Sequence, residues 1–216
     1  MKLAFSRSRV KALTLVEVLV VVVVLILLFL WLVPVTTRTS VKAPKIVCAN
    51  NLKQIGLSFR LFATDHSDAF PMKVSTNKGG SKEFTSAAEL FRHYQSMSNQ
   101  LSTPKVLVCP ADTRRPASSF TNLSNLNVSY FVALDSDETM PQMLLAGDRN
   151  LTTNGVQVPP GLLVLITNSV LGWSATMHNG SGNATLGDGS VQPFTPARLQ
   201  DQISSMETGT NRLLIP

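Results

Sequence analysis

The feature that most constrains this chain is a nearly unbroken apolar run, ALTLVEVLVVVVVLILLFLW, over residues 12–31. A helix over residues 15–33, at about 1.5 Å per residue, is as long as the hydrocarbon core of a bilayer is thick, roughly 30 Å. The sequence therefore predicts a single transmembrane helix over residues 13–34. The run ends without the small-residue cleavage site of a secretory signal peptide, so we expect ordinary signal-peptide removal not to occur.

Basic residues are concentrated before this run, and no acid accompanies them: Lys2, Arg7, Arg9 and Lys11. The positive charges after the run are more widely spaced, which predicts a cytoplasmic N-terminus and a C-terminal part outside the inner membrane. The formal net charge is +6. Because the four leading residues supply most of it and leave only +2, the charge does not indicate a nucleic-acid partner.

Glu17 is the one charged residue inside the apolar run. A carboxylate in a membrane helix costs a few kcal/mol, and such residues usually mark a partner or a function. One interpretation is structural, with Glu17 close enough to the end of the run for its side chain to reach the interface. The other is that Glu17 pairs with a positive group of another chain in the same bilayer. The residue by itself leaves both interpretations open.

The segment from Lys11 to Glu17, with its basic leader, small residue, apolar residue and glutamate, resembles the processing site of type IV prepilins and type II secretion pseudopilins. The resemblance implies that prepilin peptidase cuts between Ala12 and Leu13 and that Leu13 is N-methylated. Glu17 is then the fifth mature residue and pairs with a neighbour's new amine, which sets the register of assembly. The family usually has Gly in place of Ala12 and commonly Phe in place of Leu13.

Four later segments resemble a group of prepilin-type proteins that carry a C-terminal His-x9-Asp-Gly motif. They are CANNLKQIG from residue 48, CPAD from residue 109, GDRN from residue 147 and HNGSGNATLGDG from residue 178. The group supplies an architecture and a pseudopilin role, but no substrate. The residues that carry the motif here are Asn51, Gln54, Gly56, His178, Asp188 and Gly189.

The chain is expected to divide into a basic leader (1–12), the transmembrane and assembly helix (13–34), its amphipathic continuation (35–68) and a periplasmic domain (69–216). Pro44 breaks the helical pattern, and apolar residues then recur at helical spacing until a helix end near residues 64–68. We expect a sheet to cover this apolar stripe, which consists of Cys48, Leu52, Ile55, Phe59 and Phe62.

Within the periplasmic domain, we predict strands over 105–109, 129–134, 143–147 and 161–167 and a helix over 83–97. Asp188-Gly189 predicts the tight turn of a hairpin over 184–194, and Thr195-Pro196 predicts the start of a helix that ends near residue 205. The fold class is therefore α+β and pilin-like, with a long N-terminal helix packed on a mainly antiparallel sheet.

The chain has two cysteines, Cys48 and Cys109. In a domain outside the cytoplasm they predict a disulfide, which would close a loop of about 60 residues and stabilise the fold by around 4 kcal/mol. The alternative is two buried free thiols, because a sequence does not show that two cysteines approach each other.

Two further patterns in the sequence suggest a catalytic site or a metal site. His178 and Asp188 with nearby serines suggest a hydrolase, but without a nucleophile elbow the favoured interpretation is that His178 hydrogen-bonds across the hairpin to hold the loop over 179–183. Two acidic clusters could supply oxygen ligands for calcium, although neither has the spacing of an EF-hand and solvated turns are favoured. The clusters are Asp65, His66 and Asp68, and Asp135, Asp137 and Glu138.

The favoured hypothesis is a non-enzymatic pseudopilin without a cofactor, which assembles into a type II secretion or type IV pilus-like filament for protein export. Its expected partners are prepilin peptidase, other pseudopilin subunits and an inner-membrane assembly platform. The second hypothesis is a membrane-anchored binding or adhesion module that holds a polysaccharide or a protein, and the third is a tethered hydrolase.

Overall fold

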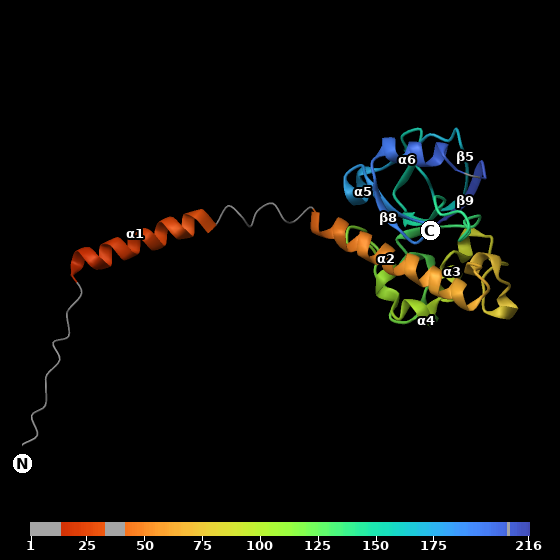
Figure 1. The fold of residues 1–216 in the computed structure, drawn as a ribbon, viewed down its shortest axis with the longest axis horizontal. Helices are drawn as coiled ribbons and strands as arrows, with labels where there is room; N and C mark the ends of the chain where they lie inside the picture. The colour runs from red at the N-terminus through yellow and green to blue at the C-terminus, as the bar shows by residue number, and fades with distance from the viewer. Residues whose placement is uncertain (1–13, 33–41, 207) are drawn as a thin grey trace, which may run out of the picture. The chain divides into compact units, whose positions relative to one another are not determined.

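The computed structural model describes residues 14–32, 42–206 and 208–216 (Figure 1). The chain divides into two units, residues 1–41 and residues 42–216, which we describe separately. The predicted leader (1–12) and the predicted join between the two N-terminal helices (33–41) lie outside the described residues.

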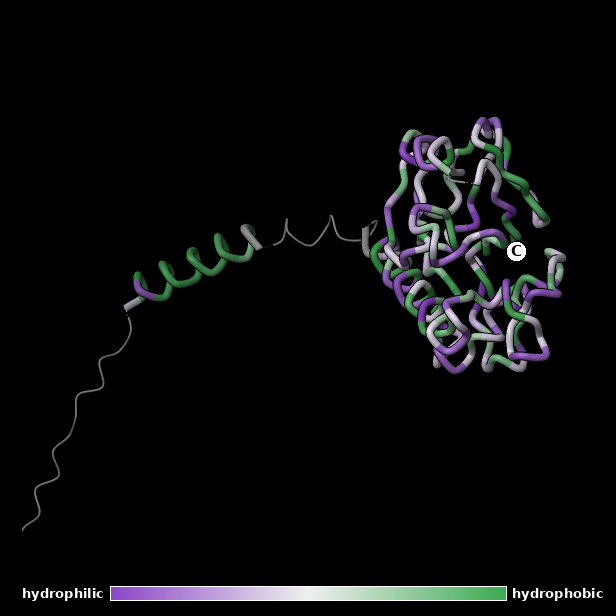
Figure 2. The backbone as a smooth tube through the Cα atoms, turned by 45° about the vertical axis from the view of Figure 1, so that its right-hand side comes forward, coloured by the Kyte–Doolittle hydropathy of each residue, from purple (hydrophilic) through white to green (hydrophobic). Residues whose placement is uncertain are grey.

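In the first unit, the described residues 14–32 form helix α1 (Leu15–Leu32), whose residues are apolar except for Glu17. Its hydrophobic colour continues around the helix in Figure 2. Within residues 14–32, 42–206 and 208–216, no helix is both long enough and apolar enough to span a membrane. The predicted span over 13–34 begins and ends outside these residues.

The second unit begins with α2 (Lys42–Asp65), which carries the predicted apolar stripe on its buried face. The helix starts two residues before Pro44, which was expected to break the pattern. A proline in the first turn is tolerated because the amide at that position has no partner inside the helix. The helix ends at Asp65, inside the predicted range.

A six-stranded antiparallel sheet follows, in the order β5-β9-β1-β2-β7-β8. Side chains of its inner strands, such as Val132 and Ala146, join those of α2 in one apolar core. The predicted packing of the stripe against a sheet is confirmed. The strands are β1 (Tyr130–Ala133), β2 (Leu144–Asp148), β5 (Gly161–Ile166), β7 (Gly182–Leu186), β8 (Val191–Phe194) and β9 (Thr210–Ile215).

A second core contains side chains from the opposite face of the sheet, such as Phe131 and Leu144, and buried residues of helix α6, Leu199 and Ile203. A small antiparallel sheet in the order β4-β3-β6 also contributes to it through Leu151 and Trp173. The domain is therefore α+β with a mainly antiparallel sheet. These elements are β3 (Leu151–Thr153), β4 (Val156–Gln157), β6 (Leu171–Trp173) and α6 (Pro196–Ser204).

Several predicted elements of the domain are confirmed. The strands over 129–134, 143–147 and 161–167 are β1, β2 and β5, and the hairpin is β7–β8. Helix α6 begins as predicted, because the Thr195 side chain accepts a hydrogen bond from the Arg198 amide and Pro196 is the first helical residue.

Two predictions are wrong. The segment over 105–109 is largely a 3-10 turn, because Thr103 caps it and Pro104 occupies its first position. The helix over 83–97 is broken into short pieces, since the side chain of Asn125 binds the Phe91 amide and the Ala87 carbonyl. The short helices of the domain are η2 (Pro71–Lys73), η3 (Thr76–Lys78), η4 (Ala87–Glu89), α3 (Phe91–Gln95), α4 (Ser98–Leu101), η5 (Pro104–Leu107), η6 (Phe120–Asn122), η7 (Asn125–Asn127) and α5 (Ala175–His178).

Candidate functional site

The N-terminal end of α1 holds the predicted assembly residue, Glu17. Its Oε2 atom accepts hydrogen bonds from the Thr14 amide and hydroxyl, both at 3.2 Å, and the Glu17 amide donates to Thr14 Oγ1 at 3.3 Å. These bonds satisfy amides that a helix N-terminus leaves without partners, where a negative charge is also favourable. The predicted processing pair, Ala12 and Leu13, lies outside the described residues.

The motif residues of α2 and of the β7–β8 turn meet in a close contact. A side chain at Gly56 would lie 2.6 Å from Thr185 Oγ1 and 3.0 Å from the Gly189 carbonyl, so the helix and the hairpin approach closely only because residue 56 is glycine. Gly189 has a φ of 79°, and Asp188 Oδ1 accepts a hydrogen bond from the Ser190 amide at 2.8 Å. The Asp-Gly pair therefore forms the predicted turn, and this turn contacts α2.

The other two motif residues of α2 differ in what they contact. Asn51 Nδ2 donates to the Val108 carbonyl at 3.0 Å and so fixes the backbone next to Cys109. Gln54 is exposed, and its side chain makes no hydrogen bond to the residues that the structure describes. The structure thus gives Asn51 a positioning role and gives none to Gln54.

Cys48 of α2 and Cys109, which follows η5, form a buried disulfide with a Cα–Cα distance of 5.0 Å. The predicted pairing is confirmed. The bond ties the helix to the loop that leads into the sheet.

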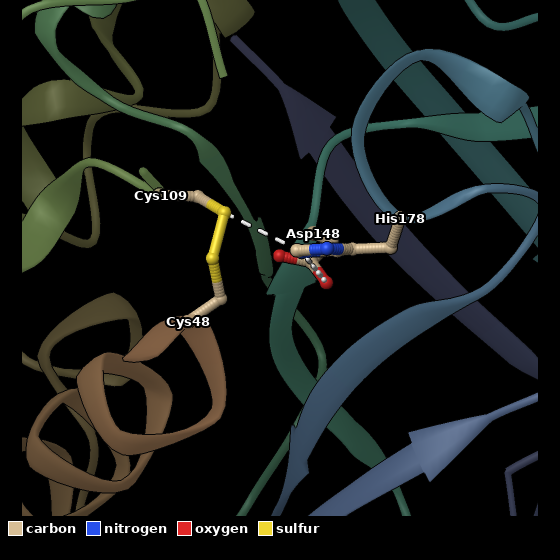
Figure 3. Close-up of side chains that lie close together, drawn as sticks. All are labelled: Cys48, Cys109, Asp148 and His178. Carbon is tan, nitrogen blue, oxygen red and sulfur yellow. Dashed lines mark hydrogen bonds and ion pairs between the residues drawn. A yellow bond between two sulfur atoms is a disulfide. The ribbon is translucent and has the colours of Figure 1, made fainter. Parts of the chain in front are cut away.

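A buried acid–imidazole pair lies against this disulfide (Figure 3). His178 Nε2, at the end of α5, is 3.3 Å from Asp148 Oδ2 of β2 and 3.4 Å from Cys109 Sγ. Asp148 is fully buried and His178 is 8% exposed. The Asn183 amide and side chain both donate to Asp148 Oδ2, at 2.7 and 3.0 Å, whereas Asp148 Oδ1 has no partner among the described residues.

The predicted contact of His178 across the hairpin is replaced by this pair. The loop over 179–183 is instead held by Ser181, whose hydroxyl donates to the His178 carbonyl at 2.7 Å and accepts from Lys45 Nζ at 2.8 Å. His178 and Asp188 lie at opposite ends of β7, about 16 Å of strand apart, so they do not form the pair that the hydrolase hypothesis needs.

The motif segments CPAD and GDRN also meet beside the disulfide. Arg149 binds Asp112 through two hydrogen bonds, Nε to Oδ2 at 2.7 Å and Nη2 to Oδ1 at 2.8 Å. Burial by itself raises the pKa of Asp112. Hydrogen bonds from Arg149 and Ser129, together with the positive charges of Arg149 and Arg114, outweigh burial and hold that pKa below its ordinary value. Neither residue has a predicted role from its motif, because the pairing of Arg149 with Asp112 depends on their positions in the fold.

The two acidic clusters do not gather their carboxylates at one point. Asp135 binds Arg212, with 2.6 Å between Oδ1 and Nη2, whereas Glu138 binds Arg60 at 3.2 Å and Asp137 Oδ1 accepts from the Thr139 amide and hydroxyl. In the other cluster, His66 hydrogen-bonds the carbonyls of Phe62 and Lys78, and Asp68 has a φ of 60°. Calcium binding stays a prediction at both clusters.

His93 is a buried titratable residue that the sequence analysis did not single out. Its Nε2 atom lies 2.8 Å from the Phe84 carbonyl, which can only accept, so Nε2 carries the proton and Nδ1 accepts from the Ser81 hydroxyl at 2.7 Å. Burial lowers the pKa of His93 to about 4. Its neutral form is therefore part of the folded structure.

The group formed by Cys48, Cys109, Asp148 and His178 is the one set of three or more His, Cys, Asp or Glu ligand atoms that the described part of the chain brings together. In the oxidised state, the His178 imidazole contacts the Asp148 carboxylate and the disulfide, and it makes no hydrogen bond to a hydroxyl of the described residues. Comparison of the chain with protein-family models, with curated proteins and with solved structures finds no match.

Proposed function

We propose that this chain is a prepilin-like pseudopilin, a structural subunit with a pilin-like arrangement that prepilin peptidase cleaves and that assembles into a type II secretion or type IV pilus-like filament for protein export. The observation that carries the proposal is helix α1, whose only charge is Glu17 in the first turn. The apolar side chains of its residues 15–30 are exposed around the helix. An all-round apolar helix needs lipid or other helices to cover it.

Glu17 suits the role of a counter-charge. Its Oε2 atom takes both bonds from Thr14, which leaves Oε1 without a partner among the described residues. Cleavage between Ala12 and Leu13 creates an amine that an incoming subunit must bury among apolar helices. An unpaired charge there is costly, so pairing with Glu17 of a neighbour fixes the register between subunits.

The domain over residues 42–216 suits a passive subunit exposed to an oxidising compartment. Its cysteines are paired, and its buried His178–Asp148 pair joins α5 to the sheet. In the proposal, α1 anchors the chain in the bacterial inner membrane, the domain lies in the periplasm, and an inner-membrane assembly platform adds the subunit to the filament.

Processing is tested by the intact mass of the full chain extracted from membranes. We expect the loss of residues 1–12 and the gain of one methyl group. Ala12→Gly restores the residue usual in the family and should be processed at least as completely, whereas a bulky Ala12→Leu variant should stay uncut. A wild-type chain that keeps its first twelve residues overturns the filament proposal.

Assembly is tested with Glu17→Gln, which removes the charge and keeps the shape of the side chain. We expect normal membrane insertion but loss of the crosslinks between subunits that the wild-type chain gives. Leu19→Ala, another exposed position on α1, is the matched control and should keep those crosslinks. Normal assembly of Glu17→Gln refutes the pairing role.

The edge strand β5 favours a membrane-anchored binding module as the second candidate. Leu162, Val164 and Ile166 alternate along this strand and are each about half exposed. Such a row on a sheet edge is a place where a protein strand can add. Val164→Lys should abolish capture of a protein partner while the crosslinks between filament subunits persist. If Val164→Lys captures the partner as well as the wild-type chain does, this second candidate is refuted.

A further inference from the structure

We propose that the chain has a second closed state in which, once the disulfide is reduced, Cys48, Cys109, Asp148 and His178 hold one zinc ion. The ligand atoms of these four residues all lie within 4.8 Å of one another. The inference goes beyond the filament role and does not depend on it.

The distances in the oxidised chain are already close to those of a tetrahedral site. His178 Nε2 lies 3.4 Å from Cys109 Sγ and 3.3 Å from Asp148 Oδ2. With zinc about 2.0 to 2.3 Å from each ligand, neighbouring ligands of a tetrahedron are about 3.3 to 3.8 Å apart. Reduction has only to let the two sulfurs separate by under about 2 Å, which side-chain rotation supplies.

The donor set and its surroundings fit a structural zinc site. Two thiolates, an imidazole and a carboxylate are ligands that zinc takes in four-coordinate closed sites, and the side chains here are buried. Asp148 is oriented by two donors from Asn183 to Oδ2, while its buried Oδ1 atom lacks a partner among the described residues. Such an outer hydrogen bond is the usual support for a metal ligand, and a cation would compensate the unpaired oxygen.

The ligands come from four segments that are far apart in the sequence: α2, the loop after η5, β2 and α5. Figure 3 shows them converging on one point from different elements. The disulfide joins only the first two of these segments. A zinc ion would join all four, so the domain could keep its architecture in a reducing compartment where the disulfide does not persist.

The two states exclude each other because each sulfur is either in the S–S bond or bound to metal as a thiolate. Two electrons and two protons from a dithiol reductant break the S–S bond and give two thiols, while the dithiol closes to its own disulfide. Zinc binding then displaces both thiol protons to solvent, and the proton between His178 Nε2 and Asp148 Oδ2 moves to Nδ1 or to solvent so that Nε2 can bind the metal.

The test uses the full chain in detergent, reduced with a dithiol that is then removed under nitrogen. Cobalt(II) is the spectroscopic probe, because it substitutes for zinc and its visible absorption reports tetrahedral thiolate coordination. We expect one cobalt per reduced chain, displaced by zinc, and none in the oxidised chain. A reduced chain that keeps its circular dichroism spectrum and binds no cobalt overturns the proposal.

Variants separate this four-ligand site from metal held by the thiols alone. Asp148→Asn and His178→Ala should each weaken cobalt binding by at least about 10-fold and change its absorption. Asp188→Asn is the matched control, because Asp188 belongs to the same motif but caps the hairpin turn. The affinity of this variant for cobalt should equal that of the wild-type chain. Equal binding by Asp148→Asn and the wild-type chain overturns the assignment.

A last measurement keeps the test decisive if reduction alone unfolds the domain. Metal binding to a site that exists only in the folded state drives folding. Zinc should then restore the far-ultraviolet circular dichroism of the reduced wild-type chain and raise its unfolding midpoint, and it should do neither in His178→Ala. A reduced chain that zinc leaves unfolded contradicts the proposal.

Discussion

The helices α1 and α2 are both rich in apolar residues, but they differ in where those residues lie. In α2, the apolar stripe is buried against the sheet, with Leu52, Ile55 and Phe59 fully covered. The large apolar side chains of α2 outside the stripe are about 43–60% exposed; they are Ile46, Val47, Leu57 and Leu61. In α1, described apolar side chains are about 47–81% exposed. A periodic stripe needs cover on one side of a helix, whereas an apolar surface all around a helix needs cover on every side.

The largest expected effect comes from removing the bond that holds α2 to the domain. Cys48→Ala with Cys109→Ala should lower the free energy of unfolding by about 4 kcal/mol, because the disulfide closes a loop over a sequence separation of 61. Chemical denaturation followed by circular dichroism measures it. Unchanged stability of the double variant would show that packing alone fixes α2.

Matched truncations on the two helices test the comparison directly. Leu52→Ala leaves a cavity in the core of α2 and should cost about 3 kcal/mol of unfolding free energy. Leu19→Ala on α1 should change that free energy by less than about 0.5 kcal/mol, because its side chain is 58% exposed. Equal losses in denaturation would contradict the difference drawn between the helices.

The domain, but not α1, should carry a pH dependence from His93. Its pKa is about 4 in the folded chain against 6.5 in the unfolded chain, so the unfolded state alone takes up the proton between these values. The contribution of His93 is complete above pH 6.5 and is lost as the pH falls to about 4, an effect of about 3 kcal/mol.

His93→Gln keeps a donor and an acceptor for Phe84 and Ser81 but does not titrate. Denaturation at pH 7, 5.5 and 4 should therefore give a flatter stability profile for the variant than for the wild-type chain. Parallel profiles would rule out His93 as the source of the slope.

The smallest of these effects concerns the contact between α2 and the hairpin. Gly56→Ala places a methyl group within 2.6 Å of Thr185 Oγ1 and 3.0 Å of the Gly189 backbone, and should cost about 2 kcal/mol of unfolding free energy. Ala49→Gly on the same helix is the control and should cost about 1 kcal/mol through helix propensity alone. A neutral Gly56→Ala would mean that the helix and the turn can separate without loss.

Much of the fold was predictable because it depends on local patterns. The stripe of α2, the Asp188-Gly189 turn and the Thr195 cap each act over a few residues, and the structure confirms all three. The prediction of a strand over 105–109 was wrong. The apolar composition of this segment suggested a strand, but Pro104 favours a turn. Strand β9 was not predicted, and it fills a place between β1 and β5 that only the finished sheet defines.

The candidate site was less predictable than the fold. The His-x9-Asp-Gly motif pointed to His178 and Asp188, and the two cysteines predicted the disulfide between Cys48 and Cys109. The acid that His178 contacts is Asp148, because β2 and β7 are neighbours in the sheet with Gly147 opposite Ala184. No spacing along the chain distinguishes these two acids.

The sequence by itself determined which parts of this protein are apolar and with what period, since hydrophobicity and turn propensity are properties of short segments. It therefore predicted the apolar α1 with its single carboxylate, the amphipathic α2 and the α+β class. The tertiary structure decided which distant polar groups meet: Asp148 with His178 beside the disulfide, and Arg149 with Asp112. Such pairs form between segments that the sheet brings together, and their free energy depends on burial that exists only after folding.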